Sequence, residues 1–303
     1  MRVLVTGASG VIGSAVCERL LTRGDEVAGL SRDPARAGRA KPGVSWHGWD
    51  PTAERPPVDA LEGVDAVINL VGEAIDQRLT DEAKERIHAS RVRATRNLVG
   101  AMTTASPRPR ALESQSAVGY YGDRGEAMVD EATPPGDDFL SRLCVEWEAA
   151  ASEAADSGIR TVIVRSGPIL DPDSGLLKQL LLPFKLGVNG PLAGGGQYMP
   201  WVHLEDEVSL LVWAAGEQSA SGVINGMAPN PLTNREFSKT LGRVLGRPAV
   251  VPVPKAAVKL LLGSELGEAV TGSQRAIPRR ALDLGFSFAH PELEPALRDL
   301  LDR

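Results

Sequence analysis

The first thirty residues of the chain change from one hydrophobic pattern to another and back. Residues 2–6 and 26–30 are short apolar runs rich in β-branched side chains, whereas apolar residues from Val11 to Leu21 recur at helical spacing and stop before Gly24. This order predicts a strand, a helix and a second strand. A parallel, doubly wound sheet begins with such a βαβ unit.

The same alternation continues along the chain. Residues 65–71 form a near-continuous apolar run, typical of a central parallel strand covered on both faces. The pattern predicts an α/β fold with a Rossmann-type doubly wound parallel sheet, followed by a smaller C-terminal lobe on the substrate side. The other elements that we expect are strands at 44–49, 111–116 and 161–165, helices at 80–104 and 139–155, and, in the lobe, a strand at 222–225 and helices at 233–245 and 296–301.

The composition is that of a globular protein and argues against several function classes. The 303 residues are 43% hydrophobic and 24% charged, and the formal net charge of −6 disfavours nucleic acid or an anionic membrane as a partner. Two distant cysteines and four histidines without ligand spacing predict no metal site. There is no apolar run of about 18 residues and a strand begins at Arg2, so we expect a cytoplasmic protein.

The turn after the first strand carries glycines at the first, fourth and seventh positions of Gly7-Ala8-Ser9-Gly10-Val11-Ile12-Gly13. Glycine at these points permits a tight turn, a close approach of backbone to a pyrophosphate and close packing of the helix on the strand. The helix also presents free N–H groups to a phosphate. An ordinary structural turn is the alternative. The dinucleotide site that we expect here consists of Thr6, Gly7, Ser9, Gly10, Val11, Ile12 and Gly13.

Two residues at the end of the second strand indicate which dinucleotide binds. Enzymes that select NAD usually carry an acidic residue here, which bonds the ribose hydroxyls. Ser31 and Arg32 stand at this place instead, and together they can bind a 2′-phosphate, which favours NADP. Asp33 beside them weakens this prediction. The alternative is that Arg32 is a solvated loop residue before a helix that starts at Asp33.

Residues just beyond the central strand are also candidates for the cofactor site. Ligands of doubly wound sheets bind in the crevice outside the C-terminal ends of the strands. This rule selects Val71, Gly72, Glu73 and Arg78. A long helix that opens with a Thr80 cap follows them.

Several short motifs in this chain carry a family resemblance when they are taken together. They are the glycine turn at 6–13, Ser116 ahead of Tyr121-Gly122, Arg165-Ser166-Gly167-Pro168 and residues 202–206, with four more at 70–75, 116–122, 144–148 and 285–288. The first four resemble the extended short-chain dehydrogenase/reductases, the group that contains nucleotide-sugar epimerases. The last four are similar to an atypical epimerase-like subfamily whose members have been labelled cell-division inhibitors.

This resemblance implies a domain organisation and a cofactor. It implies an NADP-binding Rossmann or epimerase-like domain over residues 1–247 and a small C-terminal domain of unknown function over residues 248–303. Members of the subfamily bind NADP(H), in agreement with Ser31 and Arg32. By the same resemblance, Glu73 and Arg78 line the cofactor.

The chain departs from that family in its proton-transfer residues. Short-chain dehydrogenases use a Tyr as general acid/base, a Lys four residues later that makes the phenol more acidic, and a Ser or Thr that bonds the substrate oxygen. Ser116 can fill the last role, but Phe139 and Leu143 stand where the Tyr and Lys are expected. Tyr120 and Tyr121 are the replacement phenols, with aromatic packing beside the cofactor as the alternative.

Three other side chains have two interpretations each. Cys144 is a reactive thiol or, because it falls in the apolar stripe of its helix, an inert core residue. His203 is an acid/base or part of a substrate-side loop whose Asp206 caps the next helix. Glu113, a charge within a strand, is an edge residue or a site carboxylate.

Two hypotheses of function follow. The first is an NADP(H)-binding oxidoreductase or epimerase with altered acid/base chemistry, in which Ser116 holds a substrate oxygen and Tyr120 or Tyr121 donates the proton. The rival is a non-catalytic protein that uses NADP(H) as a structural or redox-sensing ligand and acts through a protein partner. The missing Tyr and Lys favour the rival, whereas the intact cofactor motif and the separate lobe favour the enzyme. Neither the small-molecule substrate nor the oligomeric state follows from the sequence.

Overall fold

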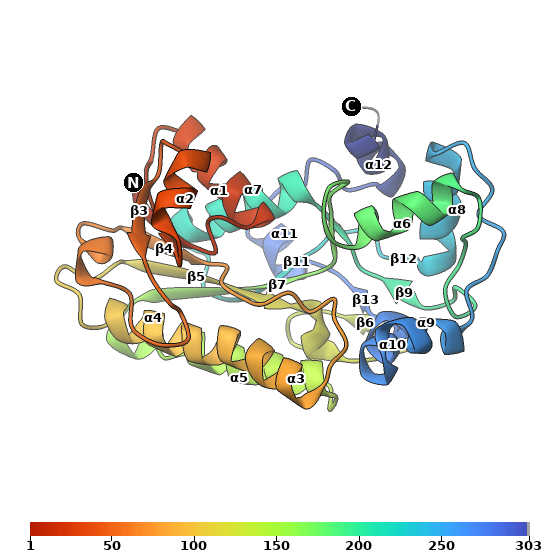
Figure 1. Ribbon diagram of the computed structural model, residues 1–303, viewed down its shortest axis with the longest axis horizontal. Helices are drawn as coiled ribbons and strands as arrows, with labels where there is room; N and C mark the ends of the chain where they lie inside the picture. Colours follow the sequence, from red (N-terminus) through yellow and green to blue (C-terminus); the bar gives the residue numbers. More distant parts are fainter. Residues whose placement is uncertain (302–303) are drawn as a thin grey trace.

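A seven-stranded parallel sheet forms the centre of the molecule, as the computed structural model shows for residues 1–301 (Figure 1). The strand order is β11-β7-β5-β4-β1-β2-β3. Because β1 pairs with β2 on one side and β4 on the other, the winding reverses there and opens a crevice at the C-terminal ends. The predicted Rossmann-type sheet is confirmed. Its strands are β1 (Arg2–Thr6), β2 (Glu26–Ser31), β3 (Ser45–Gly48), β4 (Ala66–Asn69), β5 (Ala111–Ala117), β7 (Arg160–Ser166) and β11 (Gly222–Gly226).

Helices cover both faces of the sheet, in keeping with the apolar character of its strands (Figure 1). In β1, Val3 and Val5 pack toward α1 and α7, whereas Leu4 packs toward α4 and α5 on the opposite face. Alternate residues of one strand therefore contribute to two separate cores. The covering helices are α1 (Val11–Thr22), α2 (Pro34–Ala40), α3 (Asp81–His88), α4 (Ala94–Met102), α5 (Phe139–Ser152) and α7 (Leu204–Gly216).

The long helix expected over residues 80–104 contains a wider turn. Thr80 caps its start, as predicted, by accepting a hydrogen bond from the Ala83 N–H. Between α3 and α4, however, Ala89–Arg93 form one π-helical turn. This turn presents Ser90 and Arg91 to the loop after β4, where Ser90 Oγ accepts from the Glu73 N–H and Arg91 Nη1 donates to the Glu73 carbonyl, both at 2.9 Å. Apolar spacing cannot reveal a single extra residue in a helix, and such turns are frequent at functional sites.

The C-terminal lobe is smaller than the sequence predicts. The strand near residues 222–225 was expected in the lobe, but β11 pairs with β7 at the edge of the main sheet after α7 crosses back. The lobe itself contains three two-stranded ribbons: β6 (Met128–Val129) with β13 (Arg275–Ala276), β8 (Ile169–Leu170) with β10 (Val202–His203), and β9 (Tyr198–Met199) with β12 (Leu232–Thr233). Its helices are α6 (Gly175–Lys185), α8 (Asn234–Val244), α9 (Lys255–Leu262), α10 (Ser264–Thr271) and α12 (Leu293–Leu301). Helix α11 (Arg279–Asp283) instead packs against β11 of the main sheet.

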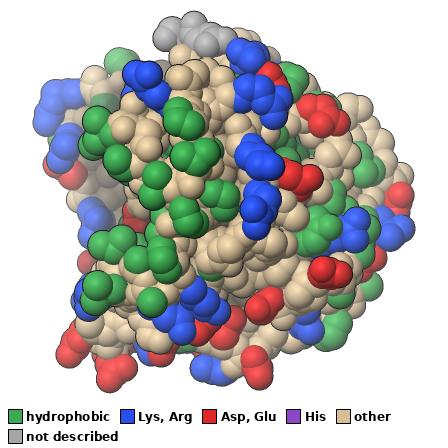
Figure 2. Space-filling view, turned by 90° about the vertical axis from the view of Figure 1, so that its right-hand side faces the viewer, with side chains coloured by type: hydrophobic (Ala, Val, Ile, Leu, Met, Phe, Trp, Pro, Cys, Tyr) green, Lys and Arg blue, Asp and Glu red, His purple; other side chains and the backbone are tan. Residues whose placement is uncertain are grey.

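The lobe also carries much of the exposed apolar surface. Figure 2, which looks at the lobe end of the molecule, shows hydrophobic side chains gathered on that face. In the part of the chain that the structure describes, no helix is both long and apolar enough to cross a membrane. The large side chains exposed in the lobe include Leu182, Leu186, Val188, Val250, Leu260 and Leu261.

Candidate functional site

The glycine turn between β1 and α1 has the shape of a phosphate cradle. Gly7 has a φ of 63°, and a Cβ on it would lie 2.7 Å from the Leu70 carbonyl oxygen. A Cβ on Gly13 would lie 2.3 Å from the Gly7 carbonyl oxygen. Residues 9–11 are exposed and no side chain caps α1, so the first N–H groups of the helix can bind a phosphate. Ile12 instead packs against the core. The turn therefore fits a dinucleotide.

Thr6, which the sequence predicts to bind the cofactor, is buried beneath the glycine turn. Its side chain is fully buried, and Oγ1 donates to Asn69 Oδ1 at 2.8 Å. The same oxygen accepts hydrogen bonds from the N–H groups of Leu70 and Val71. With no polar atom left to face a ligand, the Thr6 side chain fixes the end of β4 beside the cradle and does not bind the cofactor itself.

At the end of β2 the structure separates the roles of three neighbouring residues. The Asp33 carboxylate accepts from the Arg36 N–H at 3.0 Å and caps α2, so it is directed at the helix. Ser31 Oγ accepts from the Asp33 N–H at 3.1 Å. Arg32 is exposed, and among the described residues it makes no hydrogen bond or ion pair. Asp33 therefore does not occupy the guanidinium that would bind a 2′-phosphate.

The loop after β4 is held by its own polar contacts. Val71 is half-buried and Gly72 exposed at its start. Glu73 Oε1 accepts from Gln77 Nε2 and from Arg86 Nε, and these bonds lower the pKa of Glu73. These contacts hold its carboxylate between Gln77 of the loop and Arg86 of α3.

Arg78 connects this loop to the C-terminal helices. Its Nη2 donates to the Leu260 carbonyl at 2.8 Å. Lys84, at the start of α3, makes a second connection through a 2.7 Å ion pair with Glu265. In this structure, Arg78 thus bridges the loop and the C-terminal segment.

A second arginine in this region, Arg91, was not predicted from the sequence. Its guanidinium lies against Gly72, where a Cβ would come 3.2 Å from Cζ, and 5.2 Å from the centre of the Trp147 ring. Burial lowers the pKa of Arg91, and no carboxylate of the described residues pairs with it. The π-helical turn directs Arg91 toward the loop after β4. Because apolar spacing does not reveal that turn, the sequence does not indicate the position of Arg91.

A buried polar network stands at the C-terminal ends of β5 and β7. Ser116 Oγ donates to Glu148 Oε1 at 2.7 Å. Arg165 binds both oxygens of that carboxylate, from Nε at 2.8 Å and from Nη2 at 2.7 Å. Exposures are 2% for Ser116, 8% for Glu148 and 3% for Arg165. Glu148 and Arg165 lie in motifs that carry the family resemblance, but the sequence predicts no role for them. It does not show that α5 and β7 bring them to Ser116.

The two candidate tyrosines occupy different places around this network. Tyr121 is fully buried; its hydroxyl donates to Asn225 Oδ1 at 2.7 Å and accepts from Arg165 Nη1 at 3.0 Å. Burial raises the pKa of Tyr121 to about 12. This placement contradicts the proton-donor role predicted for Tyr121, because its hydroxyl is enclosed and has partners. Tyr120 is half-buried, with the Arg165 guanidinium 3.3 Å from the centre of its ring, and its role stays a prediction.

The start of α5 carries no acid/base group in place of the missing pair. Phe139 and Leu143 pack together with Ile87 and Trp147 in an apolar cluster. Cys144, one residue further, is 3% exposed, and burial raises the pKa of its thiol to about 12. Cys144 is therefore a protonated core residue, the second of the two interpretations given to it.

Glu113 lies in a central strand and is not an edge residue. It is fully buried in β5, and neither of its carboxylate oxygens has a hydrogen-bond partner. Glu207 of α7, also fully buried, accepts from Ser166 Oγ and Gln115 Nε2. Burial raises the pKa of Glu207 to about 7, and burial together with the Glu207 charge raises that of Glu113 well above its usual value.

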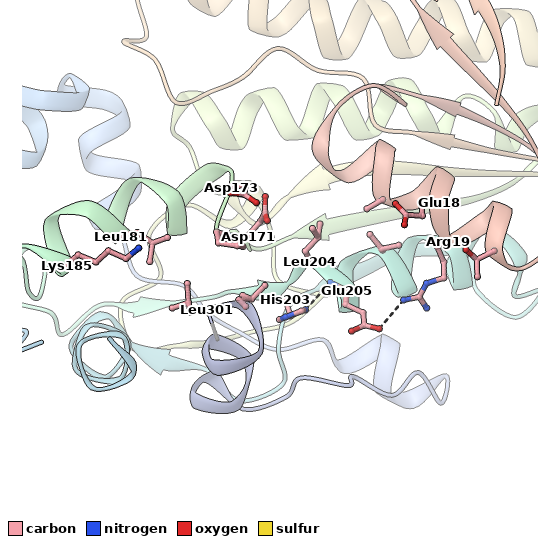
Figure 3. Close-up of a pocket in the computed structure, with 15 residues that line it drawn as sticks. Glu18, Arg19, Asp171, Asp173, Leu181, Lys185, His203, Leu204, Glu205 and Leu301 are labelled. Atoms are coloured by element: carbon pink, nitrogen blue, oxygen red, sulfur yellow. Dashed lines mark hydrogen bonds and ion pairs between the residues drawn. The ribbon is translucent and has the colours of Figure 1, made fainter. Parts of the chain in front are cut away.

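A cavity lies away from these residues. It has a volume of about 810 Å³ between α1, α6, α7 and α12, with Glu18 and Arg19 on one side and Lys185 on the other (Figure 3). Of the described residues predicted for the cofactor or for catalysis, none lines it. His203 and Glu205 lie on its floor (Figure 3).

Two histidines that are distant in sequence meet beside this cavity. The rings of His203 and His290 stack at 3.8 Å, and His290 Nε2 lies 3.2 Å from Glu205 Oε2, so these three side chains are close enough to hold a metal. His203 Nδ1, however, caps α7 by accepting from the Glu205 N–H at 3.0 Å. The neutral ring then carries its proton on Nε2 and has no lone pair there for a metal. Asp206, the predicted cap, instead accepts from the N–H groups of Ala289 and His290.

Comparisons with known proteins agree with this architecture. Residues 3–225 match the model of the NAD dependent epimerase/dehydratase family, and residues 253–300 match a domain of unknown function (DUF1731). The chain is 39% identical over 305 residues to the human epimerase family protein SDR39U1, covering 99% of this chain and 100% of that protein.

Two solved structures show the same fold. A crystal structure of human SDR39U1 (isoform 2) with NADPH has a TM-score of 0.90 and 38% identity, and covers 100% of both chains. A nucleoside-diphosphate sugar epimerase from Corynebacterium glutamicum has a TM-score of 0.80 and 31% identity, covering 99% of this chain and 58% of that one. The chain presented here belongs to the NAD dependent epimerase/dehydratase family.

Proposed function

We propose that this protein is an NADP(H)-dependent oxidoreductase or epimerase of the extended short-chain type that acts on a small molecule. The observation that carries this proposal is the Ser116 network, which stands at the same edge of the sheet as the open glycine turn. Two functional parts thus meet at the C-terminal ends of the strands, where ligands of this fold bind. The NADPH in the human relative supports the choice of cofactor.

Different residues of this chain would bind different parts of the cofactor and the substrate. The glycine turn and the first turn of α1 would hold the pyrophosphate, and Ser31 and Arg32 the 2′-phosphate. A bound nicotinamide would supply or accept the hydride. Ser116 would hold the substrate oxygen that loses or gains a proton. The buried thiols of Cys17 and Cys144 support a cytoplasmic location for this reaction.

One observation favours the rival function, a non-catalytic NADP(H)-binding regulator that acts through a protein partner. Phe139 and Leu143 are core residues, so the place that carries the general acid/base in related enzymes is chemically inert. The two functions differ in one measurable property. Both bind NADPH, but only an enzyme changes a substrate: an oxidoreductase consumes the nicotinamide, and an epimerase inverts a substrate centre and returns the nicotinamide to its starting state.

The cofactor assignment is tested by titrating the protein with NADPH and NADH while following fluorescence. We expect Arg32→Ala to weaken NADPH binding about 10- to 100-fold, because a hydrogen bond to a charged group contributes about 1.5–3 kcal/mol, and to leave NADH binding almost unchanged. Arg36→Ala, an exposed arginine on α2, is the matched control and should alter neither. Equal weakening of both cofactors by Arg32→Ala would overturn the 2′-phosphate assignment.

The choice between enzyme and regulator is tested by adding sugars, ketones and aldehydes to the NADPH complex. Oxidation of NADPH by any member of the panel supports the enzyme and identifies its substrate class. Tight NADPH binding with neither oxidation nor an epimerised product across the panel would favour the regulator, and a search for a protein partner would follow.

A further inference from the structure

The Ser116 hydroxyl directs its only proton into the protein, and the inference drawn from this rests on the proposed function. Oγ donates to Glu148 Oε1 at 2.7 Å. An ionised carboxylate only accepts, so the direction of this bond is fixed by chemistry. The lone pairs of Ser116 Oγ are then the part of the group that a ligand can use. In this state a substrate group that contacts Oγ must donate a hydrogen bond to it, as a hydroxyl does, whereas a carbonyl can bind Oγ once the proton lies on Glu148 and Ser116 donates outward.

Glu148 is held so that it cannot turn away from Ser116. Arg165 forms two parallel bonds to its carboxylate, a geometry that fixes the plane of the group. Arg165 is itself fixed, because Nη1 donates to Tyr121 and the Tyr120 ring covers the guanidinium. The carboxylate is thus a rigid proton acceptor next to Ser116.

Tyr121, Cys144 and Arg165, which lie around Glu148, are unsuited to exchange the substrate proton. Burial raises the pKa values of Tyr121, beside Arg165, and of Cys144, on the same helix as Glu148, to about 12. Tyr121 also donates its hydroxyl to Asn225. Arg165 stays charged at any pH at which the protein is folded. Tyr120, half-buried beside Arg165, remains a predicted proton donor, whereas Glu148 is the carboxylate that Ser116 Oγ contacts directly.

We infer that Ser116 and Glu148 form a proton relay that takes the place of the missing Tyr–Lys pair. In the oxidation direction, the substrate hydroxyl proton moves to Ser116 Oγ while the Ser116 proton moves to Glu148 Oε1. The electron pair of the broken O–H bond becomes the second bond of the new carbonyl. The C–H hydrogen leaves with its electron pair to the bound oxidised nicotinamide, which supplies the oxidant. In reduction, Glu148 returns the proton along the same path.

The first test measures turnover of the compound that oxidises NADPH in the panel. Glu148→Gln keeps an acceptor for Ser116 but cannot take up a proton, and we expect turnover to fall about 100- to 10,000-fold with the NADPH dissociation constant within twofold. Turnover of Ser116→Ala should fall by a similar factor. Ser116→Thr, which restores the hydroxyl, should recover most of the lost turnover. Ser152→Ala is the control, because Ser152 bonds the Glu148 backbone carbonyl and not its carboxylate.

The second test needs no turnover. Infrared spectra of protein labelled with ¹³C-glutamate, taken as wild type minus Glu148→Gln, isolate the carboxylate stretch of Glu148. We expect an ionised band at neutral pH that shifts in Ser116→Ala and not in Ser152→Ala. If Glu148→Gln fails to fold, Ser116→Ala minus wild type gives the same comparison.

The outcomes separate the relay from the function on which it rests. Undiminished turnover in Glu148→Gln, or a Glu148 band unmoved by loss of the Ser116 hydroxyl, would overturn the relay and leave the oxidoreductase in place. A different result is that the Glu148 band shifts in Ser116→Ala as expected while the wild-type protein turns over no compound of the panel. That result would overturn the enzymatic function and, with it, the catalytic role of the pair. Loss of turnover with rescue by Ser116→Thr supports both.

Discussion

Glu207 should make the protein less stable as the pH rises. Its pKa is about 7 in the folded protein and 4.5 without the fold, because burial disfavours the charged form. The folded state therefore binds more protons than the unfolded state between these values, and stability falls as the pH rises from about 4.5 to about 7. At about 1.4 kcal/mol for each pH unit between the two pKa values, ionised Glu207 opposes folding by about 3 kcal/mol.

Glu207→Gln removes this effect, because glutamine is neutral at every pH. Its Oε1 can still accept from Ser166 and Gln115, as the Glu207 oxygen does at 2.5 and 3.1 Å. We expect the stability of the variant relative to wild type to improve by about 3 kcal/mol between pH 4.5 and pH 8, whatever the constant cost of the substitution. The like charge acting on Glu113 also disappears, which adds in the same direction.

The assay is urea unfolding of the cofactor-free protein, followed by circular dichroism at several pH values. Glu205→Gln is a control of opposite sign on the same helix, because hydrogen bonding from His290 lowers the pKa of Glu205. That variant should lose stability relative to wild type as the pH rises toward about 4.5, and the difference should change little above that pH. A difference between Glu207→Gln and wild type that does not change with pH would refute the reasoning.

Two further predictions concern buried groups. Thr6→Val leaves Asn69 Oδ1 and two backbone N–H groups without their partner, so we expect a loss of about 3 kcal/mol in urea unfolding; a loss equal to that of the exposed control Thr22→Val would contradict the role of Thr6 in fixing β4. Burial raises the pKa values of Cys17 and Cys144 to about 11 and about 12, so neither thiol should react with a thiol reagent at pH 8 until the protein unfolds; labelling of the folded protein at the unfolded rate would contradict their burial.

The sequence predicts local structure well where a pattern and its consequence lie within a few residues. The β1-α1-β2 unit, the Thr80 cap and the helix start at Asp33 are such cases, since apolar spacing and a capping side chain act within one turn. The position of β11 is different, because its partner β7 is chosen by the path of α7 across the sheet. No periodicity in residues 222–226 contains that information.

The candidate site divides along the same line. The glycine turn can be predicted from the sequence because its residues are consecutive and steric contacts explain why glycine is needed there. Ser116 was also found, but its partners Glu148 and Arg165 come from α5 and β7, and only their meeting in space gives them a chemical role. Tyr121 follows Ser116 closely in the chain, yet its hydroxyl is directed into the protein, a direction that sequence spacing does not fix.

The contacts of Arg78 and Lys84 connect the C-terminal helices to the loop that we propose for the cofactor site. The loop after β4 and the helices α9 and α10 are joined by a hydrogen bond to the Leu260 carbonyl and an ion pair to Glu265. If a dinucleotide orders this loop, the free energy it contributes also favours docking of those helices, and thermodynamic reciprocity requires the reverse. On the proposed function, we then expect removal of the segment matched to a domain of unknown function to weaken the affinity for the cofactor.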